Sequence, residues 1–182
     1  MSDKEIRELS VHARPSNKKA QRISFVLLLG AAACIISCCF ILNYQIIPTV
    51  FTVVLASTAI MIYTRYIAAS YLYDITVGAE GEPIFVVRSR TGRRETTLLR
   101  VDLYAIKSIE RLTREDKKAY KCDTGVVRYN YCPTLFPDTS VLLTVRSQYE
   151  NADVFIEITD EFCEYLSTVS TEAKENYLID ND

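Results

Sequence analysis

Two long apolar segments dominate the hydrophobic pattern of this chain. Residues 23–42 form a run of 20 residues without a charge, and residues 49–63 add 15 more, with Ile46 and Ile47 extending the second run. A helix rises about 1.5 Å per residue and the apolar core of a bilayer is about 30 Å thick, so each run is close to spanning length. Because residues 43–48 are too few for a domain, the pattern predicts a transmembrane helical hairpin over residues 23–63.

Two other structures would give a similar pattern. A buried helical pair in a soluble protein is also apolar, but buried helices seldom continue for 20 residues without a charge. A cleaved export signal also follows basic residues, here Arg14, Lys18, Lys19 and Arg22. The apolar region of such a signal has about 7–15 residues, however, and here a second spanning run follows. The membrane hairpin is therefore the interpretation that we favour.

The charges around the hairpin predict its topology. Basic residues precede the first run and Arg65 follows the second, whereas the connecting loop carries no charge. The positive-inside rule then places both termini in the cytoplasm and residues 43–45 outside, in a two-span protein of the cell (plasma) membrane. Tyr44, Tyr63 and Tyr66 would lie at the membrane interfaces. Residues 1–22 are expected to be a mostly mobile basic tail, acting either as a topology signal or as a regulated membrane latch.

From residue 71 the pattern changes to short alternating segments separated by turn residues, which is typical of strands. The expected strands cover residues 71–77, 84–88, 95–101, 105–112 with a bulge, part of 119–131, 141–146 and 153–158. A tight turn is expected at 89–92 and a charged loop at 113–118. A helix over 161–175, N-capped by Thr159 or Asp160, would dock through Phe162, Leu166 and Val169. The pattern predicts an α+β membrane protein with about seven antiparallel strands and one C-terminal helix.

Two stretches carry a resemblance to a known family. The first is Tyr71, Tyr73, Ile75 and Val77, at the exit from the hairpin, and the second is Asp102, Leu103, Ile106 and Ile109. With the order of elements over residues 23–175, they resemble the bacterial pleckstrin-homology-like (PH-like) domains, which are often attached to paired transmembrane helices. The resemblance implies a partly closed antiparallel β-barrel at 71–175, capped by the C-terminal helix and followed by an acidic tail at 176–182.

Catalytic and metal chemistry have little support in the sequence. His12 is the only histidine, and Cys34, Cys38 and Cys39 lie inside the first apolar run. The other three cysteines, Cys122, Cys132 and Cys163, form no Cys-x-x-Cys pair, so reduced thiols are the simpler interpretation. We therefore expect no enzyme activity, no cofactor and no metal site.

Charge is distributed unevenly along the chain, which has a net charge of −2. Residues 84–128 hold 12 Lys and Arg against 6 Asp and Glu, and residues 150–182 hold 10 acids against one Lys. The candidate contact set is Arg88, Arg90, Arg93, Arg94 and Arg100, on and beside the second predicted hairpin. These arginines either keep a turn solvated, or contact anionic lipid head groups or an acidic partner protein, or form a specific lipid site. No aromatic residues are interleaved with them, which disfavours nucleic acid.

The loop at 132–138 is a second candidate. Leu135 and Phe136 would form an interaction patch if exposed and would cap the domain if buried, and we expect burial. The function that follows is a non-enzymatic integral membrane protein whose cytosolic domain binds a protein or an anionic membrane. The alternative is an accessory subunit of a membrane transporter or export complex that acts through its transmembrane helices, with small residues at 31–33 and 56–57 for close helix packing.

Overall fold

The computed structural model describes residues 11–13, 17–40, 46–78, 81–121, 123–147 and 151–180. Two compact units are present, one within Pro15–Ala69 and the other formed by the N-terminal segment together with the chain from Ser70 onward. The predicted loop at 43–45, with Tyr44, lies outside the described residues, as do residues 1–10 and 14–16 of the tail, Cys122 and residues 181–182 of the acidic tail.

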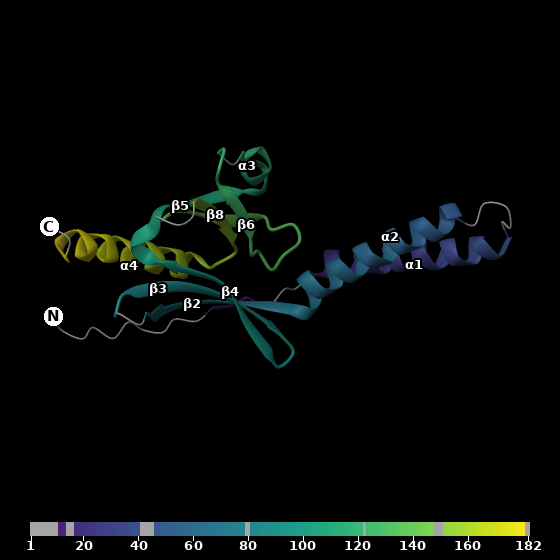
Figure 1. Cartoon of the computed structure of the whole chain (residues 1–182), viewed down its shortest axis with the longest axis horizontal. Helices are drawn as coiled ribbons and strands as arrows, with labels where there is room; N and C mark the ends of the chain where they lie inside the picture. The colour runs from purple at the N-terminus through teal and green to yellow at the C-terminus, as the bar shows by residue number, and fades with distance from the viewer. Residues whose placement is uncertain are drawn as a thin grey trace. The chain divides into compact units, whose positions relative to one another are not determined.

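The first unit is a pair of long helices, α1 (Lys18–Phe40) and α2 (Ile46–Tyr63), which lie side by side in Figure 1. A single π-helical segment, η1 (Thr64–Ala68), continues α2. Lys18–Cys38 and Ile46–Ala68 are each long and apolar enough to cross a membrane. The predicted helical pair is confirmed, although α1 begins at Lys18, before the apolar run.

Small residues, with leucine and isoleucine between them, form the contact between the two helices. Buried or half-buried positions recur three and four residues apart along both helices, as in an antiparallel coiled coil. We call them the seam: Ala20, Ser24, Leu27, Ala31 and Cys34 on α1, with Thr52, Leu55, Ala59 and Ile62 on α2. Of the small residues predicted to pack, Ala31 is in the seam and Ala56 is half-buried, whereas Ala32, Ala33 and Ser57 are exposed.

Polar contacts cross this pair at three levels. The Asn17 side chain donates to the Tyr66 carbonyl at 3.2 Å, and the Ser24 hydroxyl donates to the Ala59 carbonyl at 3.3 Å. Near the other end, the sulfur of Cys38 lies 3.8 Å from the hydroxyl of Thr49. Such contacts fix the register of two helices when apolar packing alone would allow them to slide.

The second unit contains two four-stranded sheets. Sheet A has the order β1 (Val11–Ala13), β2 (Ala69–Val77), β3 (Pro83–Thr91) and β4 (Arg94–Asp102). The 3-10 turn η2 (Leu103–Ala105) leads into sheet B, with the order β5 (Ile106–Thr113), β7 (Thr139–Arg146), β8 (Asn151–Ile156) and β6 (Val127–Asn130). The two sheets are separate and do not close into a barrel.

Two predictions about the second unit are wrong, one on strand direction and one on the N-terminal tail. β6 runs parallel to β8, with Val127 opposite Ala152, so the domain is not wholly antiparallel. β1 pairs with β2, Val11 opposite Tyr73 and Ala13 opposite Tyr71, so this part of the tail is an ordered strand and the expectation of a mostly mobile tail is wrong for it. The expected bulge is confirmed as a register shift between Ile106 and Ser108.

Three boundaries also differ. Residues 114–119 form a short helix, α3 (Arg114–Ala119), in place of the expected charged loop, because Thr113 and Asp116 make a reciprocal capping box. β3 continues to Thr91, so the turn is shorter than predicted. The C-terminal helix α4 (Asp160–Asp180) is capped by Thr159 and runs past residue 175.

The larger hydrophobic core of the described residues lies between the sheets and α4, and a smaller one contains Cys132, Leu142 and Phe155. Fully buried members of the larger core include Tyr73 and Ile75 from β2, Phe85 from β3, and Val154 and Ile156 from β8. The helix contributes Phe162 and Leu166, as the predicted stripe required, with Val169 half-buried beside them. Farther along the helix, the buried Ser170 hydroxyl donates to the Leu103 carbonyl at 3.1 Å, which ties α4 to η2.

Candidate functional site

The predicted arginine set lies on the hairpin of β3 and β4. Thr91 pairs with Arg94, so only Gly92 and Arg93 form the turn. Gly92 has φ +61°, the left-handed conformation that a two-residue hairpin turn requires. The end of this hairpin therefore presents the exposed side chains of Arg90, Arg93 and Arg94, which we call the arginine tip.

The five arginines differ in their ionic partners. Arg88 Nε lies 3.6 Å from the carboxylate of Asp74 on β2, and Arg90 lies 3.7 Å from Glu95 across the hairpin. Among the residues that the structure describes, Arg93, Arg94 and Arg100 have no ion pair. The arginine tip thus carries a net excess of positive charge even with Glu95 beside it.

A hydrogen bond places the arginine tip at one end of sheet A. The Ser70 hydroxyl donates to the carbonyl of Arg90 at 3.3 Å. β2 follows η1 directly in the sequence, and Ser70 is its second residue. The tip therefore lies at the end of the sheet where the chain enters it from the helices.

The remaining two arginines are elsewhere. Arg100 pairs with Val86, six residues along β4 from Arg94, which at about 3.3 Å per residue is about 20 Å from the tip. The side chain of Arg88 forms an ion pair with the mostly buried carboxylate of Asp74. The structure thus brings three of the five predicted residues together at the tip, places Arg100 far from them, and pairs the adjacent Arg88 with Asp74.

The loop at 132–138 is only partly buried. Leu135 is half-buried, but Phe136 is 42% exposed, so the expectation that both are buried is wrong for Phe136. The guanidinium of Arg114 lies 5.2 Å from the centre of the Phe136 ring, and the Arg114 amide donates to the Asp138 carbonyl. A cation over an aromatic face keeps this ring at the surface.

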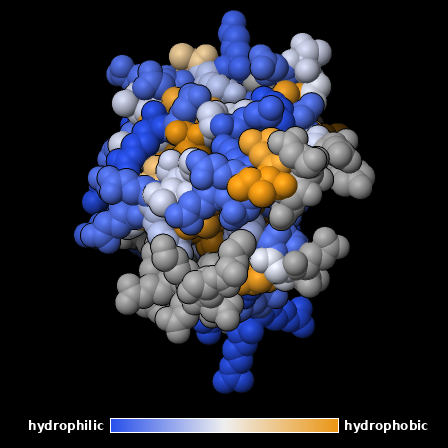
Figure 2. Space-filling model, turned by 90° about the vertical axis from the view of Figure 1, so that its left-hand side faces the viewer, coloured by the Kyte–Doolittle hydropathy of each residue, from blue (hydrophilic) through white to orange (hydrophobic). Residues whose placement is uncertain are grey.

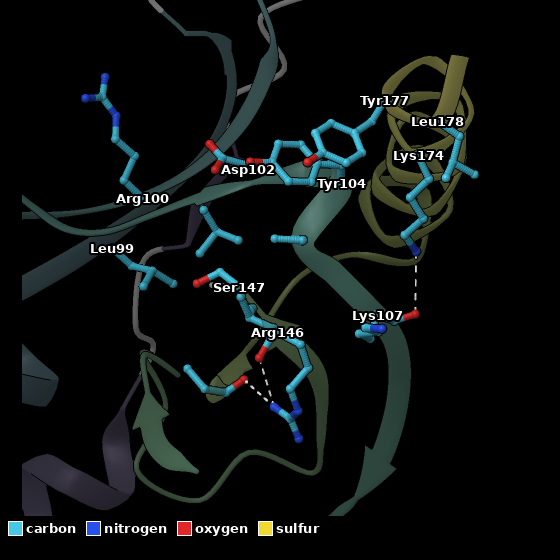
Figure 3. Close-up of a pocket in the computed structure, with 14 residues that line it drawn as sticks. Leu99, Arg100, Asp102, Tyr104, Lys107, Arg146, Ser147, Lys174, Tyr177 and Leu178 are labelled. Atoms are coloured by element: carbon cyan, nitrogen blue, oxygen red, sulfur yellow. Dashed lines mark hydrogen bonds between the residues drawn. The ribbon is translucent and has the colours of Figure 1, made fainter. Parts of the chain in front are cut away.

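Sequence reasoning missed a pocket at the far end of β4. The pocket has a volume of about 860 Å³ and lies between the end of β4, η2, the ends of β7 and β8 that meet there, and the last turns of α4. At its mouth the rings of Tyr104 and Tyr177 stack with centres 4.3 Å apart, as Figure 3 shows. Tyr177 could not be assigned to this wall because the predicted helix ended at residue 175.

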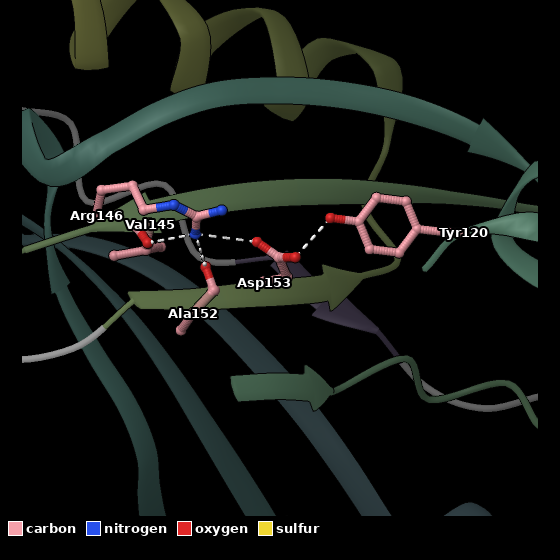
Figure 4. Close-up of polar contacts among 5 residues, drawn as sticks. All are labelled: Tyr120, Val145, Arg146, Ala152 and Asp153. Atoms are coloured by element: carbon pink, nitrogen blue, oxygen red, sulfur yellow. Dashed lines mark hydrogen bonds and ion pairs between the residues drawn. The ribbon is translucent and has the colours of Figure 1, made fainter. Parts of the chain in front are cut away.

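A buried polar network lies beside this pocket. Arg146 Nη1 donates to Asp153 at 3.1 Å, and also to the carbonyls of Val145 and Ala152, while the Tyr120 hydroxyl donates to the other oxygen of Asp153 (Figure 4). Asp153 is fully buried, so the cation and the hydroxyl stabilise its charge where water does not reach. This network is a structural feature of sheet B.

Thiols and acids do not converge on a metal site in the described residues. Cys34 and Cys38 are half-buried thiols in α1, and Cys132 and Cys163 are buried thiols in the second unit, none of them in a disulfide within the described residues. Lys117 Nζ lies 3.1 Å from Cys132 Sγ. No group of three or more His, Cys, Asp or Glu side chains within the described ranges could hold a metal ion.

Comparisons with protein-family models, with curated proteins and with solved structures give no significant match to this chain.

Proposed function

We propose that this chain is a non-enzymatic integral membrane protein whose α1–α2 hairpin crosses the bilayer twice and whose sheet unit contacts the anionic face of the same membrane. The element order, two sheets over a shared core followed by a helix, supports a PH-like arrangement for that unit. It departs from the expected barrel in the parallel β6 and in the separation of the sheets.

The surface of the helices supports membrane insertion. Most of the exposed large hydrophobic side chains in the described part of the chain lie on α1 and α2, for example Phe25, Val26, Phe51 and Val53. The face of the second unit in Figure 2 is instead mostly hydrophilic, with small separate hydrophobic areas. In water such helical faces would drive association, whereas in lipid they need no further partner.

Strand pairing supports a common side for both ends of the hairpin. β1 precedes α1, β2 follows α2 and η1, and the two strands are hydrogen-bonded neighbours in sheet A. Neighbouring strands must occupy one compartment. A hairpin that crosses the membrane twice satisfies this condition, and the positive-inside rule makes that compartment the cytoplasm.

The single observation that carries the membrane-contact proposal is the bond from Ser70 to Arg90. It holds the arginine tip at the end of sheet A that is covalently nearest to the helices. Each basic residue close to an anionic surface contributes on the order of 1 kcal/mol, and the attraction decays over a Debye length of about 10 Å in 0.1 M salt. Arg93 and Arg94 are exposed basic residues, and they contribute this attraction when the tip lies within about 10 Å of the head groups.

Tryptophan fluorescence tests this proposal in the full chain. The protein contains no tryptophan, so Thr91→Trp introduces a single reporter at the tip. Tyr104→Trp, at the other end of β4, is the matched control. Both variants are reconstituted into vesicles of brominated phosphatidylcholine with phosphatidylglycerol, in which bromine quenches fluorophores that touch the bilayer.

We expect stronger quenching at position 91 than at position 104, a decrease in that quenching as salt rises, and its loss in the Arg90→Ala, Arg93→Ala, Arg94→Ala background. Replacing phosphatidylglycerol by a zwitterionic lipid should have the same effect as salt. Equal quenching of the two reporters, or quenching that is unaffected by the three substitutions, would contradict the proposal.

A further inference from the structure

The pocket between η2 and α4 is distinct from the arginine tip, because the two lie at opposite ends of β4. Its volume of about 860 Å³ falls in the range of about 300–1,000 Å³ that is typical of sites for small molecules. The walls come from both sheets and from the end of the C-terminal helix, so the pocket belongs wholly to the second unit.

The inner wall of the pocket is apolar. Val101, Ala105, Val145 and Ala152 line it and are also members of the buried core. These side chains are held in place by the packing of both sheets, so the wall is preformed. Leu99 and Leu178 add apolar surface on opposite sides of the lining, the latter beside the stacked tyrosine rings (Figure 3).

The charged residues of the lining are mainly basic. Lys107 and Lys174 contribute cations, Arg146 is paired with the buried Asp153, and Asp102 is the one carboxylate among the lining residues that the structure describes. Arg100 also belongs to the lining, but its guanidinium points away from the other lining side chains in Figure 3. A low-dielectric wall beside several cations concentrates positive potential in the pocket.

Asp102 offsets at most one of the two lysine charges in the lining. Partial burial, followed by the nearby Asp102 carboxylate, raises the pKa of Tyr104 above the usual value. The ammonium of Lys174 makes one contact of 3.5 Å, to the Lys107 carbonyl, and an ammonium has three donors. Arg146 directs Nη1 to Asp153 and the two carbonyls, and its other nitrogens make no hydrogen bond within the described part of the chain. Donors therefore remain for an anion.

We propose that this pocket binds a small anionic amphiphile, with its carboxylate or phosphate group at Lys107 and Lys174 and its apolar body against Val101, Ala105 and Val145. The stacked rings of Tyr104 and Tyr177 cover the body at the mouth. This binding is independent of the membrane contact made by the arginine tip.

Calorimetric titration with octyl phosphate tests the inference on the full chain in zwitterionic nanodiscs, with empty nanodiscs as the reference and octanol as the uncharged counterpart. The charge-removing variant is Lys107→Gln with Lys174→Gln. A matched control, Lys118→Gln with Lys121→Gln, removes the same charge from exposed positions outside the pocket. Tyr177→Ala shortens the wall without touching a charge, and the arginine tip variant reports on the membrane surface.

We expect saturable binding of one octyl phosphate per chain, with weaker binding of octanol. The dissociation constant should rise roughly tenfold in the Lys107, Lys174 variant, since two partly exposed cations contribute about that much together. It should also rise for Tyr177→Ala, and it should stay unchanged in the Lys118, Lys121 control and in the tip variant.

Three outcomes would overturn the inference. The first is no saturable heat above that of empty nanodiscs, and the second is equal binding of octanol and octyl phosphate. The third is loss of binding in the tip variant with retention in the Lys107, Lys174 variant, which would leave the membrane-contact proposal intact and remove the pocket. Conversely, failure of the tip reporter at position 91 would not alter the titration.

Discussion

The Ser70 hydroxyl and the Arg90 carbonyl, which are 20 residues apart in the sequence, are joined by a hydrogen bond of 3.3 Å. The acceptor is the backbone of Arg90, and its side chain is therefore not needed for the link. The position of the arginine tip is thus built into the backbone of sheet A, and its charge can be changed separately.

The tip substitutions should accordingly leave the fold intact. Arg90→Ala, Arg93→Ala and Arg94→Ala remove exposed side chains and one exposed ion pair, which typically changes the free energy of unfolding by less than about 1 kcal/mol. Thermal unfolding followed by circular dichroism should show nearly the same midpoint as the parent chain. A large decrease would mean that these arginines are structural.

Arg88 should behave in the opposite way. Its partner Asp74 is mostly buried, and Arg88→Ala removes the cation 3.6 Å from that carboxylate. Because the arginine side chain is 37% exposed, we expect a loss of only about 1–2 kcal/mol in stability, with quenching of the tryptophan at position 91 unchanged. The same two measurements, unfolding and quenching, separate Arg88 from Arg93 and Arg94.

The close packing of α1 against α2 along the seam should require a small side chain at Ala59, which is 1% exposed. In a Thr49→Cys chain the new thiol should form a disulfide with Cys38 under mild oxidation, because the native sulfur and hydroxyl are 3.8 Å apart. Adding Ala59→Leu should separate the helices and slow that reaction, whereas Ala32→Leu, on the exposed face, should not. Mass spectrometry of the tryptic peptides identifies the product.

Two Arg–Asp pairs offer a direct comparison of buried and exposed charges. Arg146→Ala removes the cation from the fully buried Asp153 and should decrease the free energy of unfolding by about 3–5 kcal/mol. Arg111→Ala breaks the pair with Asp160 at the surface, where both side chains are exposed, and should lower it by less than about 1 kcal/mol. Urea unfolding measures both losses, and equal losses would contradict a larger contribution from the buried pair.

Tyr73 should make the second unit sensitive to alkaline pH. Burial, followed by the nearby Cys132, raises the pKa of the Tyr73 hydroxyl well above its usual value of about 10, and this hydroxyl donates to the Tyr131 carbonyl at 2.8 Å. Below pH 10 the group is neutral in both the folded and the unfolded chain and contributes no pH dependence. Above pH 10 it ionises first in the unfolded chain, so stability falls by up to about 1.4 kcal/mol per pH unit.

Tyr73→Phe provides the control for this effect. The variant loses one hydrogen bond, at a cost of about 1 kcal/mol at neutral pH, and its urea midpoint should fall less steeply above pH 10 than that of the parent chain. Identical slopes in the two proteins would assign the alkaline sensitivity to other groups.

The sequence was sufficient for features set by local periodicity. The apolar runs predicted α1 and α2, and alternation predicted most of β2, β4, β7 and β8, because burial of one face imposes a period of two. The sequence also contained a signal for α3, since Thr113 and Asp116 have the spacing of a capping box. The charged residues around them led to the prediction of a loop instead. The true end of α4 was missed because Tyr177, Leu178 and Ile179 continue the helix on an exposed face.

Pairing between distant segments could not be predicted. β6 alternates in the ordinary way, and nothing in residues 127–130 indicates that it lies parallel to β8. The division of the arginines had the same cause, because the partner of Arg88 is on β2 and the neighbour of Arg90 is Ser70. The pocket requires residues from β4, β7 and α4 at once, so no single stretch of sequence shows it.

The pairing of β1 with β2 sets an order for the synthesis of this protein. Val11 leaves the ribosome about 60 residues before its partner Tyr73, and both apolar helices are made in between. At about 5–20 residues per second, β1 waits about 3–12 s before a strand exists for it to join. Sheet A is therefore completed only after the whole hairpin has been translated, and an error in placing either helix would leave its first strand without a neighbour.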